Sequence, residues 1–285
     1  MKINHNGTLL EEEYRQSLNR NRAFGFGDGL YDTLKFVGGE VEFLEEHYFR
    51  LMSSMRMLRM KIPPAFTLEV YQEEIVKTLK ANEMVDSDAR VRVNFYRCDG
   101  GGFTPVSNVS DYLIEVGELS APGTDSVEVE LFKDYHLASG LLSTIKTNNR
   151  IVNVLGGIFA LENDFQNVVL MNEKKELVGL TDANLFLLKE GKVLTPALEC
   201  GCINGIMRKK IIEAIQASPE IEVEETSITP FELLRADEVF FSNSLIGMQS
   251  VNRYRKKVYG AEMTDRIRAK LSGMGISQDK GQEIR

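Results

Sequence analysis

The sequence contains few of the residues that build metal centres and disulfide frameworks. Its 285 residues include only three cysteines and three histidines, namely Cys98, Cys200, Cys202, His5, His47 and His136. An odd, sparse cysteine count argues against a disulfide framework, and the Cys-Gly-Cys segment at 200–202 lacks the spacing and the second pair of a zinc knuckle. The histidines are too scattered for a metal site or a nucleophile–histidine pair. We therefore expect reduced thiols, no bound metal, and neither a metallohydrolase nor a serine or cysteine hydrolase.

Long apolar runs and an excess of positive charge are also missing. The formal net charge is −8, with acids and bases mixed along the chain, which argues against binding to a nucleic-acid backbone. Apolar runs such as 238–241 are too short to span a bilayer, and residues 1–6 do not resemble the start of a signal peptide. We expect a cytoplasmic protein with neither nucleic acid nor membrane as a partner.

The length allows two medium-sized domains, and turn-forming residues at 120–124 predict the boundary between them. In the first half, residues 41–60 and 68–79 repeat apolar side chains at helical spacing, and Pro63-Pro64 should end the first helix. Residues 89–96 and 111–116 are predicted to be strands. Residues 1–120 therefore form a domain of mixed α and β structure.

The second half, residues 121–285, is predicted to contain helices at 151–162 and 205–216 together with short strands. The strands are expected at 127–131, 168–171, 177–180, 184–188, 192–194 and 238–242, of which the segment 238–242 is expected to be the last. Gly156-Gly157, inside the first of these helices, suggests close packing.

Lys146 is the most informative residue, because it is a lone amine between an extended stretch and a helix-like stretch. By itself it fits either a solvated lysine at a strand–helix junction or an amine that forms a Schiff base. Arg50, on a half-apolar edge of its helix, fits either a salt bridge or a clamp on phosphate. The helix start at 204–208 and the turn at 242–245 are weaker candidates for anion binding.

Several segments in the same order make the chain resemble the class IV aminotransferases. They are FGFGDGLYDT at 24–33, HYFRL at 47–51, Lys146 with NRIVNVL at 149–155, NLF at 184–186, LTP at 194–196, GIMR at 205–208 and DEVF at 237–240. Each segment is loose alone, but their order over residues 20–251 is far more specific. The family consists of pyridoxal 5'-phosphate enzymes of fold type IV and includes branched-chain aminotransferase, D-amino-acid aminotransferase and aminodeoxychorismate lyase.

This resemblance implies how the cofactor is held. Lys146 would bind the aldehyde of pyridoxal 5'-phosphate as a Schiff base and later move the α-proton of the substrate. The phosphate would be bound by Arg50, by backbone amides around Gly205, Ile206 and Met207, and by Ser244. The family usually has Thr where this chain has Met207, so one side-chain contact to the phosphate is missing.

The resemblance also implies substrate contacts. Tyr31 would line the substrate pocket, and Leu245 would offer a backbone N–H to the substrate carboxylate. Arg150 would lie near the phenolic oxygen of the cofactor, in a pattern that resembles the lyase branch. Arg90, Arg92 and Arg97 lie on or beside one predicted strand. They either are ordinary exposed charges or bind a second substrate carboxylate, for which Arg97 is our candidate.

Gly179 is the sharpest departure from the family pattern. Five residues before Asn184, the aminotransferases carry a Glu that pairs with the pyridine nitrogen of the cofactor, a bond of about 1.5–3 kcal/mol. Glu176 and Asp182 lie an odd number of positions away, so in a regular strand they would point to the opposite face. Thr181 lies on the same face and offers a neutral hydrogen bond instead.

The implied architecture is an α/β (α+β) fold of type IV with two domains and the cofactor in the cleft between them. A small N-terminal α/β domain, residues 1–120, would carry Arg50, and a larger C-terminal domain with a β-barrel core, residues 121–285, would carry Lys146. The resemblance also implies a homodimer that acts on an amino acid or amino-carboxylate.

Three hypotheses of function stay open. Transamination and the aminodeoxychorismate lyase reaction, which forms 4-aminobenzoate and pyruvate, both begin with removal of the α-proton. The Asn149-Arg150 pattern leans to the lyase, whereas the abundance of aminotransferases in the family leans to transamination. Gly179 and Met207 suggest a weakened or non-catalytic member, and retention of both Lys146 and Arg50 argues against that.

Overall fold

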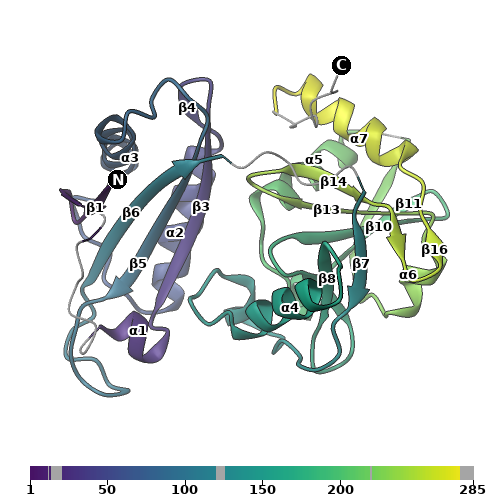
Figure 1. The fold of residues 1–285 in the computed structure, drawn as a ribbon, viewed down its shortest axis with the longest axis horizontal. Coiled ribbons are helices and arrows are strands. Elements are labelled where there is room, and N and C mark those ends of the chain that lie inside the picture. Colours follow the sequence, from purple (N-terminus) through teal and green to yellow (C-terminus); the bar gives the residue numbers. More distant parts are fainter. Residues whose placement is uncertain (12, 14–20, 120–125, 219, 277–285) are drawn as a thin grey trace. The chain divides into compact units, whose positions relative to one another are not determined.

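A six-stranded antiparallel sheet in the order β2-β1-β6-β5-β3-β4 forms the centre of the N-terminal part of the computed structural model (Figure 1). The strands are β1 (Lys2–His5), β2 (Thr8–Glu11), β3 (Gly29–Val37), β4 (Glu40–Val41), β5 (Ala89–Arg97) and β6 (Ser110–Glu118). The helices are α1 (Arg22–Phe26), α2 (Leu44–Met57) and α3 (Leu68–Ala81). The structure describes residues 1–11, 13, 21–119, 126–218 and 220–276.

Buried and more exposed residues alternate along the strands, which explains why α2 and α3 cover one face of this sheet. Alternate residues of β5, such as Val91, Val93 and Phe95, are fully buried and join the buried face of α2 in one apolar cluster. The Thr67 hydroxyl accepts a hydrogen bond from the Val70 N–H and caps α3, as expected for a threonine at a helix start. The predicted helices and strands of residues 41–116 are confirmed, with shifts of a few residues at their ends.

Two five-stranded sheets form the C-terminal part, in the orders β12-β11-β10-β13-β14 and β16-β15-β7-β8-β9. The first contains β10 (Asn184–Lys189), β11 (Lys192–Pro196), β12 (Glu222–Thr226), β13 (Glu238–Asn243) and β14 (Gly247–Val251). The second contains β7 (Glu128–Leu131), β8 (Asn167–Met171), β9 (Leu177–Leu180), β15 (Arg253–Tyr254) and β16 (Lys257–Val258). Buried residues of both sheets share one core. The barrel core expected from the family is thus seen as two sheets around a common core.

The prediction that 238–242 is the last strand was wrong. Strands β14, β15 and β16 follow it, and helix α7 (Glu262–Gly273) comes after them. The remaining helices are η2 (Leu141–Thr144), α4 (Ile151–Glu162), η3 (Leu198–Cys200), α5 (Ile206–Gln216) and α6 (Phe231–Arg235). The predicted close packing is confirmed at Gly156, where a Cβ would lie 3.1 Å from the side chains of Leu170 and Val168, but it is wrong at Gly157, where a Cβ would have nothing within 4 Å. None of the helices in the described residues combines the length and apolar character needed to cross a membrane.

By its internal contacts the chain divides into two units. The first unit is Met1–Ser120 with Ile145–Asn149, and the second is Ala121–Thr144 with Arg150–Arg285. The predicted linker at 120–124 lies outside the described residues. Lys146 was expected in the C-terminal domain, but its segment packs with the first unit, because its backbone hydrogen-bonds to β3.

Candidate functional site

Lys146 is held against the first residues of β3. Its carbonyl accepts a hydrogen bond from the Tyr31 N–H at 2.8 Å, and the Asn148 N–H donates to the Gly29 carbonyl at 3.0 Å. A Cβ on Gly29 would lie only 2.8 Å from the Asn148 side chain, so glycine permits this close approach. The segment 145–149 therefore extends the sheet of the first unit and fixes the backbone of Lys146.

The ring of Tyr31 lies close to two cations. The Lys146 Nζ is 5.3 Å from the ring centroid, and the guanidinium carbon of Arg92 is 4.3 Å from it. Arg92 comes from β5, where it pairs with Thr33 of β3, and its Nε donates to Asn94 Oδ1 at 3.5 Å. Both cation–ring distances fall in the range of cation–π contacts. The arrangement brings an amine and a guanidinium together around one aromatic ring.

Asp32 forms a buried ionic cluster with α2. It occupies a core-facing position between Leu30 and Leu34 and is only 2% exposed. Its Oδ1 accepts a hydrogen bond from Arg50 Nη2 at 2.5 Å, and its Oδ2 accepts one from Arg50 Nε at 3.2 Å. Burial raises the pKa of Asp32, but the charge of Arg50, the hydrogen bond from His47 and the charge of Lys146 outweigh burial and hold that pKa well below its usual range. Asp32 is therefore ionised at neutral pH.

His47 completes this cluster in its neutral form. Its Nδ1 lies 3.1 Å from Asp32 Oδ2, and its side chain is fully buried. Burial lowers the pKa of His47, and the attraction of Asp32 offsets this only in part. A carboxylate only accepts hydrogen bonds, so Nδ1 carries the hydrogen and donates it to Asp32. The other ring nitrogen, Nε2, is buried without a hydrogen-bond partner.

Arg97, the candidate for a second substrate carboxylate, lies in a different network. It is 7% exposed, and its Nε donates to Asp28 Oδ2 at 3.0 Å. Its other nitrogens donate to the Leu58 carbonyl at 2.7 Å and to Asn108 Oδ1 at 2.5 Å. Arg22 donates to the same Asp28 carboxylate at 2.7 Å. These contacts favour a structural role for Arg97, which ties the β5–β6 connection to the end of α2.

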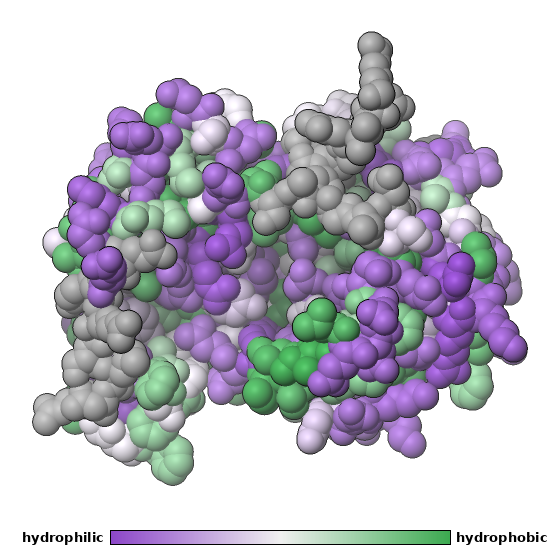
Figure 2. All heavy atoms as spheres, in the orientation of Figure 1, coloured by the Kyte–Doolittle hydropathy of each residue, from purple (hydrophilic) through white to green (hydrophobic). Residues whose placement is uncertain are grey.

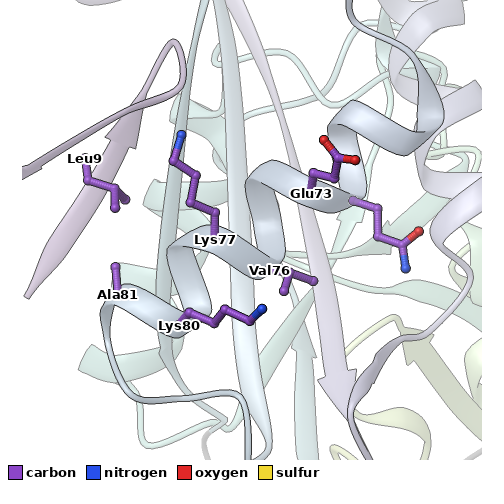
Figure 3. A pocket seen from close by; sticks show the side chains of 7 residues that line it. Leu9, Glu73, Val76, Lys77, Lys80 and Ala81 are labelled. Carbon is purple, nitrogen blue, oxygen red and sulfur yellow. The ribbon is translucent and has the colours of Figure 1, made fainter.

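This network lines a cavity of about 290 Å³ together with Thr147 and Asn149. A separate surface groove of about 630 Å³ runs between β2 and the outer face of α3 (Figure 3). The groove is lined by Leu9, Gln72, Glu73, Val76, Lys77, Lys80 and Ala81. None of the residues predicted for the site lies in the groove, so it supports no part of the predicted chemistry.

In the second unit, helix α5 begins without a side-chain cap. Gly205 is its N-cap and makes no side-chain capping bond, so the first N–H groups of the helix are suited to an anion. A Cβ on Gly205 would lie 2.1 Å from Asn184 Oδ1, which explains the glycine. Asn184 in turn donates to the Ile203 carbonyl at 2.8 Å. Ile206 and Met207 are buried directly after this cap.

The turn after β13 holds Ser244 and Leu245, and one of its predicted donors is already used. The Leu245 N–H donates to Asn243 Oδ1 at 2.9 Å, and the Ile246 N–H donates to the same oxygen at 3.0 Å. A substrate carboxylate would have to replace the bond between Leu245 and Asn243. Arg150, the residue predicted near the phenolic oxygen, is the N-cap of α4.

Position 179 has no space for an acid. A Cβ on Gly179 would lie 2.7 Å from the carbonyl oxygen of Ala183, a distance that real Cβ contacts do not show. That carbonyl closes a turn by accepting from the Leu180 N–H at 2.9 Å. The glutamate of the family pattern therefore does not fit unless this turn moves.

Thr181, predicted to donate in place of the missing acid, is hydrogen-bonded to Asn167. Its hydroxyl donates to Asn167 Oδ1 at 2.8 Å, and its backbone N–H donates to the same atom at 3.2 Å. A hydroxyl has one hydrogen to donate, so the predicted neutral hydrogen bond from Thr181 would have to replace its bond to Asn167. Glu176 is also engaged, by Asn172 at 2.7 Å and by Ser227 at 2.7 Å.

A family model described as Amino-transferase class IV matches residues 29–254. The chain belongs to the class IV aminotransferases. This class IV aminotransferase is similar to the aminodeoxychorismate lyase of Vibrio harveyi, with 30% identity over 239 residues that cover 81% of the chain and 85% of the lyase. The match of the family model spans the segment of Lys146, the cluster of Asp32 and the start of α5.

Solved structures of the family share its fold. The branched-chain amino acid aminotransferase of Escherichia coli has a TM-score of 0.86 at 21% identity and covers 99% of this chain and 97% of its own. The branched-chain aminotransferase of Thermoproteus uzoniensis, solved with norvaline, has a TM-score of 0.86 at 21% identity, covering 97% and 96%. At these identities the likeness concerns the fold alone, which is the mixed α/β fold of type IV.

Proposed function

We propose that this class IV aminotransferase binds pyridoxal 5'-phosphate and acts on an amino group next to a carboxylate. The observation that carries the proposal is the position of Lys146, whose amine lies over Tyr31 while Arg92 packs against the same ring. An amine for the cofactor and a cation for the substrate carboxylate are thereby held by the backbone of one sheet.

The residues present fit most parts of this cofactor. Lys146 supplies the amine, Arg50 supplies a cation that is held in place by Asp32, and the α5 start with its uncapped N–H groups suits a phosphate. The ring nitrogen lacks the glutamate of the family pattern, because the Ala183 carbonyl closes the space at Gly179, and Met207 supplies no hydroxyl for the phosphate. These contacts support cofactor binding, and they leave the ring nitrogen without a carboxylate in the described residues.

When bound, the cofactor supplies an aldehyde and a conjugated ring that accepts electrons from the substrate α-carbon. The chain's own residues do the rest. Lys146 would hold the cofactor through its amine and would take the α-proton from the substrate. Arg50 would bind the phosphate, as would the amides of Ile206 and Met207 and the hydroxyl of Ser244. Arg92 would bind a substrate carboxylate, and Tyr31 would pack against the substrate.

The reaction that follows α-proton removal has two candidates. Transamination is the activity named for the two solved structures described above, whereas the relative at 30% identity is named a lyase. Arg150, beside Asn149, matches the lyase pattern, so aminodeoxychorismate lyase is the specific alternative. Incubation with 4-amino-4-deoxychorismate separates the two, since the lyase releases 4-aminobenzoate and pyruvate without an amino acceptor.

Cofactor binding is tested by adding pyridoxal 5'-phosphate to the purified protein. We expect a visible absorbance band that borohydride removes, with the label on Lys146 after digestion and mass spectrometry. Lys146→Ala should lose the band, and the control Lys174→Ala, in an exposed turn, should keep it. A wild-type protein that cannot be loaded would refute the proposal. A loaded protein without turnover on any amino acid or on aminodeoxychorismate would support the non-catalytic hypothesis instead.

Cytoplasmic localisation and a homodimer are part of the same proposal. Their support is the family membership.

A further inference from the structure

Two polar atoms in the core of the first unit are buried without a hydrogen-bond partner among the described residues. They are Nε2 of His47 and the hydroxyl oxygen of Tyr71, Oη. Both side chains are 0% exposed. Buried polar groups of folded proteins are hydrogen-bonded in the great majority of cases, so each of these two atoms needs a partner.

Tyr71 reaches the cluster of Asp32 from helix α3. Its ring lies against the ring of Tyr48, with 5.9 Å between the centroids, and Tyr48 is the neighbour of His47 in α2. Burial raises the pKa of Tyr71, and the charge of Asp32 raises it further, while the charge of Arg50 lowers it. The hydroxyl therefore lies within the electrostatic reach of the same carboxylate that binds His47.

The outer side of α3 meets the solvent, but its inner side does not. Figure 2 shows mainly hydrophilic side chains where Figure 1 places α3. On this helix Gln72 and Lys80 are exposed, whereas Tyr71 and Ile75 are fully buried. Bulk water does not reach the Tyr71 hydroxyl, so its partner lies inside the core.

Asp32 is not that partner, because its carboxylate is saturated. Its Oδ1 accepts from Arg50 Nη2 and from the Thr33 N–H at 2.7 Å. Its Oδ2 accepts from Arg50 Nε and lies 3.1 Å from His47 Nδ1. Two carboxylate oxygens offer about four acceptor sites. The neutral ring of His47 keeps a lone pair on Nε2, and this nitrogen is the acceptor that remains for a donor from the side of Tyr71.

We propose that one buried water bridges the Tyr71 hydroxyl to Nε2 of His47. The two atoms are not hydrogen-bonded to each other, and a water both accepts from the hydroxyl and donates to the nitrogen. Buried waters with roughly two to four polar partners are an ordinary part of protein cores. The bridge completes a chain of hydrogen bonds from Tyr71 through the water, His47 and Asp32 to Arg50.

This chain makes Tyr71 a positioning residue for Arg50. With Nε2 occupied as an acceptor, the ring hydrogen of His47 stays on Nδ1 and is donated to Asp32. The carboxylate in turn orients the guanidinium of Arg50. In the proposed function Arg50 binds the phosphate of the cofactor, so the role of Tyr71 rests on that function, whereas the bridge itself does not.

A crystal structure of the wild-type protein locates the water directly. We expect an ordered water within hydrogen-bond distance of both atoms, and none at that place in Tyr71→Phe. Nitrogen-15 NMR of the histidine side chains follows the same contact in solution. In Tyr71→Phe the Nε2 resonance of His47 should move toward that of a nitrogen without a hydrogen bond. A dry gap in the wild type, or an unchanged resonance in the variant, would overturn the bridge.

Tyr48→Phe is the matched control. The Tyr48 hydroxyl donates to the Phe66 carbonyl at 2.9 Å, so this variant also removes a hydrogen-bonding hydroxyl from the same group of rings. It should lower thermal stability but leave the resonance of His47 and the affinity for the cofactor as in the wild type. Far-UV circular dichroism verifies that both variants are folded.

Cofactor affinity shows whether Tyr71 acts through Arg50. Tyr71→Phe should raise the Kd of pyridoxal 5'-phosphate about threefold to tenfold, the effect of one ordinary hydrogen bond. It should leave the Kd of pyridoxal, which lacks the phosphate, unchanged. In an Arg50→Gln background Tyr71→Phe should have no further effect. Equal losses for both compounds, or a loss that persists without Arg50, would overturn the positioning role.

The failure of the bridge and the failure of the proposed function give different results. A wild type that does not bind pyridoxal 5'-phosphate refutes the proposed function, while the crystal structure and the resonance of His47 still test the bridge. A wild type that binds the cofactor no more tightly than folded Tyr71→Phe keeps the function and overturns the role of Tyr71.

Discussion

Asp32 accepts two hydrogen bonds from Arg50, at 2.5 Å and 3.2 Å, from a position inside the core of the first unit. This pair fixes the plane of the guanidinium through its Nε and Nη2 edge. The sequence offered a salt bridge and a phosphate clamp as alternative roles for Arg50. The structure confirms the salt bridge, while the clamp stays part of the proposal. The two roles are compatible, because a carboxylate on one edge of a guanidinium orients the other edge.

Replacing Asp32 should be costly for folding. We expect Asp32→Asn to lower the free energy of unfolding by about 3–5 kcal/mol, because Arg50 would be left as a largely buried charge without its partner. The control is Asp265→Asn, an exposed partner of Arg268 on α7, which should change stability by less than about 1 kcal/mol. Urea denaturation at pH 7 measures both. Equal effects of the two variants would contradict the ion-pair assignment.

The same variant should show a defined pH dependence. The charge of Arg50, the hydrogen bond from His47 and the charge of Lys146 lower the pKa of folded Asp32 below its usual value of 3.8. The stabilisation by Asp32 is therefore fully present above that value and is lost as the pH falls through the folded pKa. The stability difference between wild type and Asp32→Asn should stay constant between pH 7 and 5 and shrink below about pH 4. A stability difference that already shrinks near pH 6 would argue against a lowered pKa of Asp32.

His47 should destabilise the fold in mild acid. Burial lowers its pKa below the usual 6.5, so between the two pKa values the unfolded chain binds more protons than the folded one. Stability must then rise with pH in that window and fall as the pH drops below about 6.5. His47→Gln should flatten this part of the curve, whereas His136→Gln, at an exposed position, should leave it unchanged. Parallel curves for wild type and His47→Gln would show that His47 is not the titrating group.

Alanine should have opposite effects on stability at Gly179 and at Gly157. Gly179→Ala should cost about 1–3 kcal/mol, since its Cβ would collide with the Ala183 carbonyl. Gly157→Ala should instead stabilise by about 0.5–1 kcal/mol, because it lies within α4 with nothing within 4 Å of its Cβ. Thermal unfolding measures the change in stability of both variants. A stabilised Gly179→Ala would mean that position 179 is open to a side chain.

Replacing Arg92 should weaken substrate binding, whereas replacing Arg97 should lower thermal stability. Arg92→Gln is expected to raise KM by about tenfold or more for substrates with a free carboxylate, with a small change in thermal midpoint. Arg97→Gln should lower the thermal midpoint, because it breaks a buried network with Asp28 and Asn108. Kinetics and calorimetry of both variants test this contrast. An Arg92→Gln enzyme with an unchanged KM would remove Arg92 from the substrate site.

Much of the secondary structure followed from local patterns. Helices α2, α3, α4 and α5 were predicted because apolar residues recur at their period and because Pro63-Pro64 interrupts the chain. Strand β3 was missed, although it carries Tyr31 and Asp32. Its core-facing positions include charged Asp32 next to Leu30 and Leu34, and Lys35 is buried as well, so the sequence does not show the apolar alternation of a half-buried strand. Strands β15 and β16 were missed because, at two residues each, they are too short to show a period.

The candidate site was predictable as a set of residues but not as an arrangement. The order of the family segments indicated four parts of the site, namely Lys146, Arg50, Tyr31 and the start of α5. It could not indicate that Asp32 and His47 surround Arg50, or that Arg92 rather than Arg97 packs on Tyr31. A core-facing aspartate between two leucines is the one sequence feature that points to such a cluster, since a buried carboxylate needs a cation.

The family, the α/β elements with a strong period and the choice of Lys146 as the candidate amine could all be inferred from the amino-acid sequence. These properties depend on local spacing and on residue types in a fixed order. Three others became visible only in the folded chain: Lys146 lies with the first unit, Asp32 neutralises Arg50, and the Ala183 carbonyl closes position 179. Each of these depends on how turns close and on contacts between separate segments, and such contacts arise only when the sheets pair and the core packs.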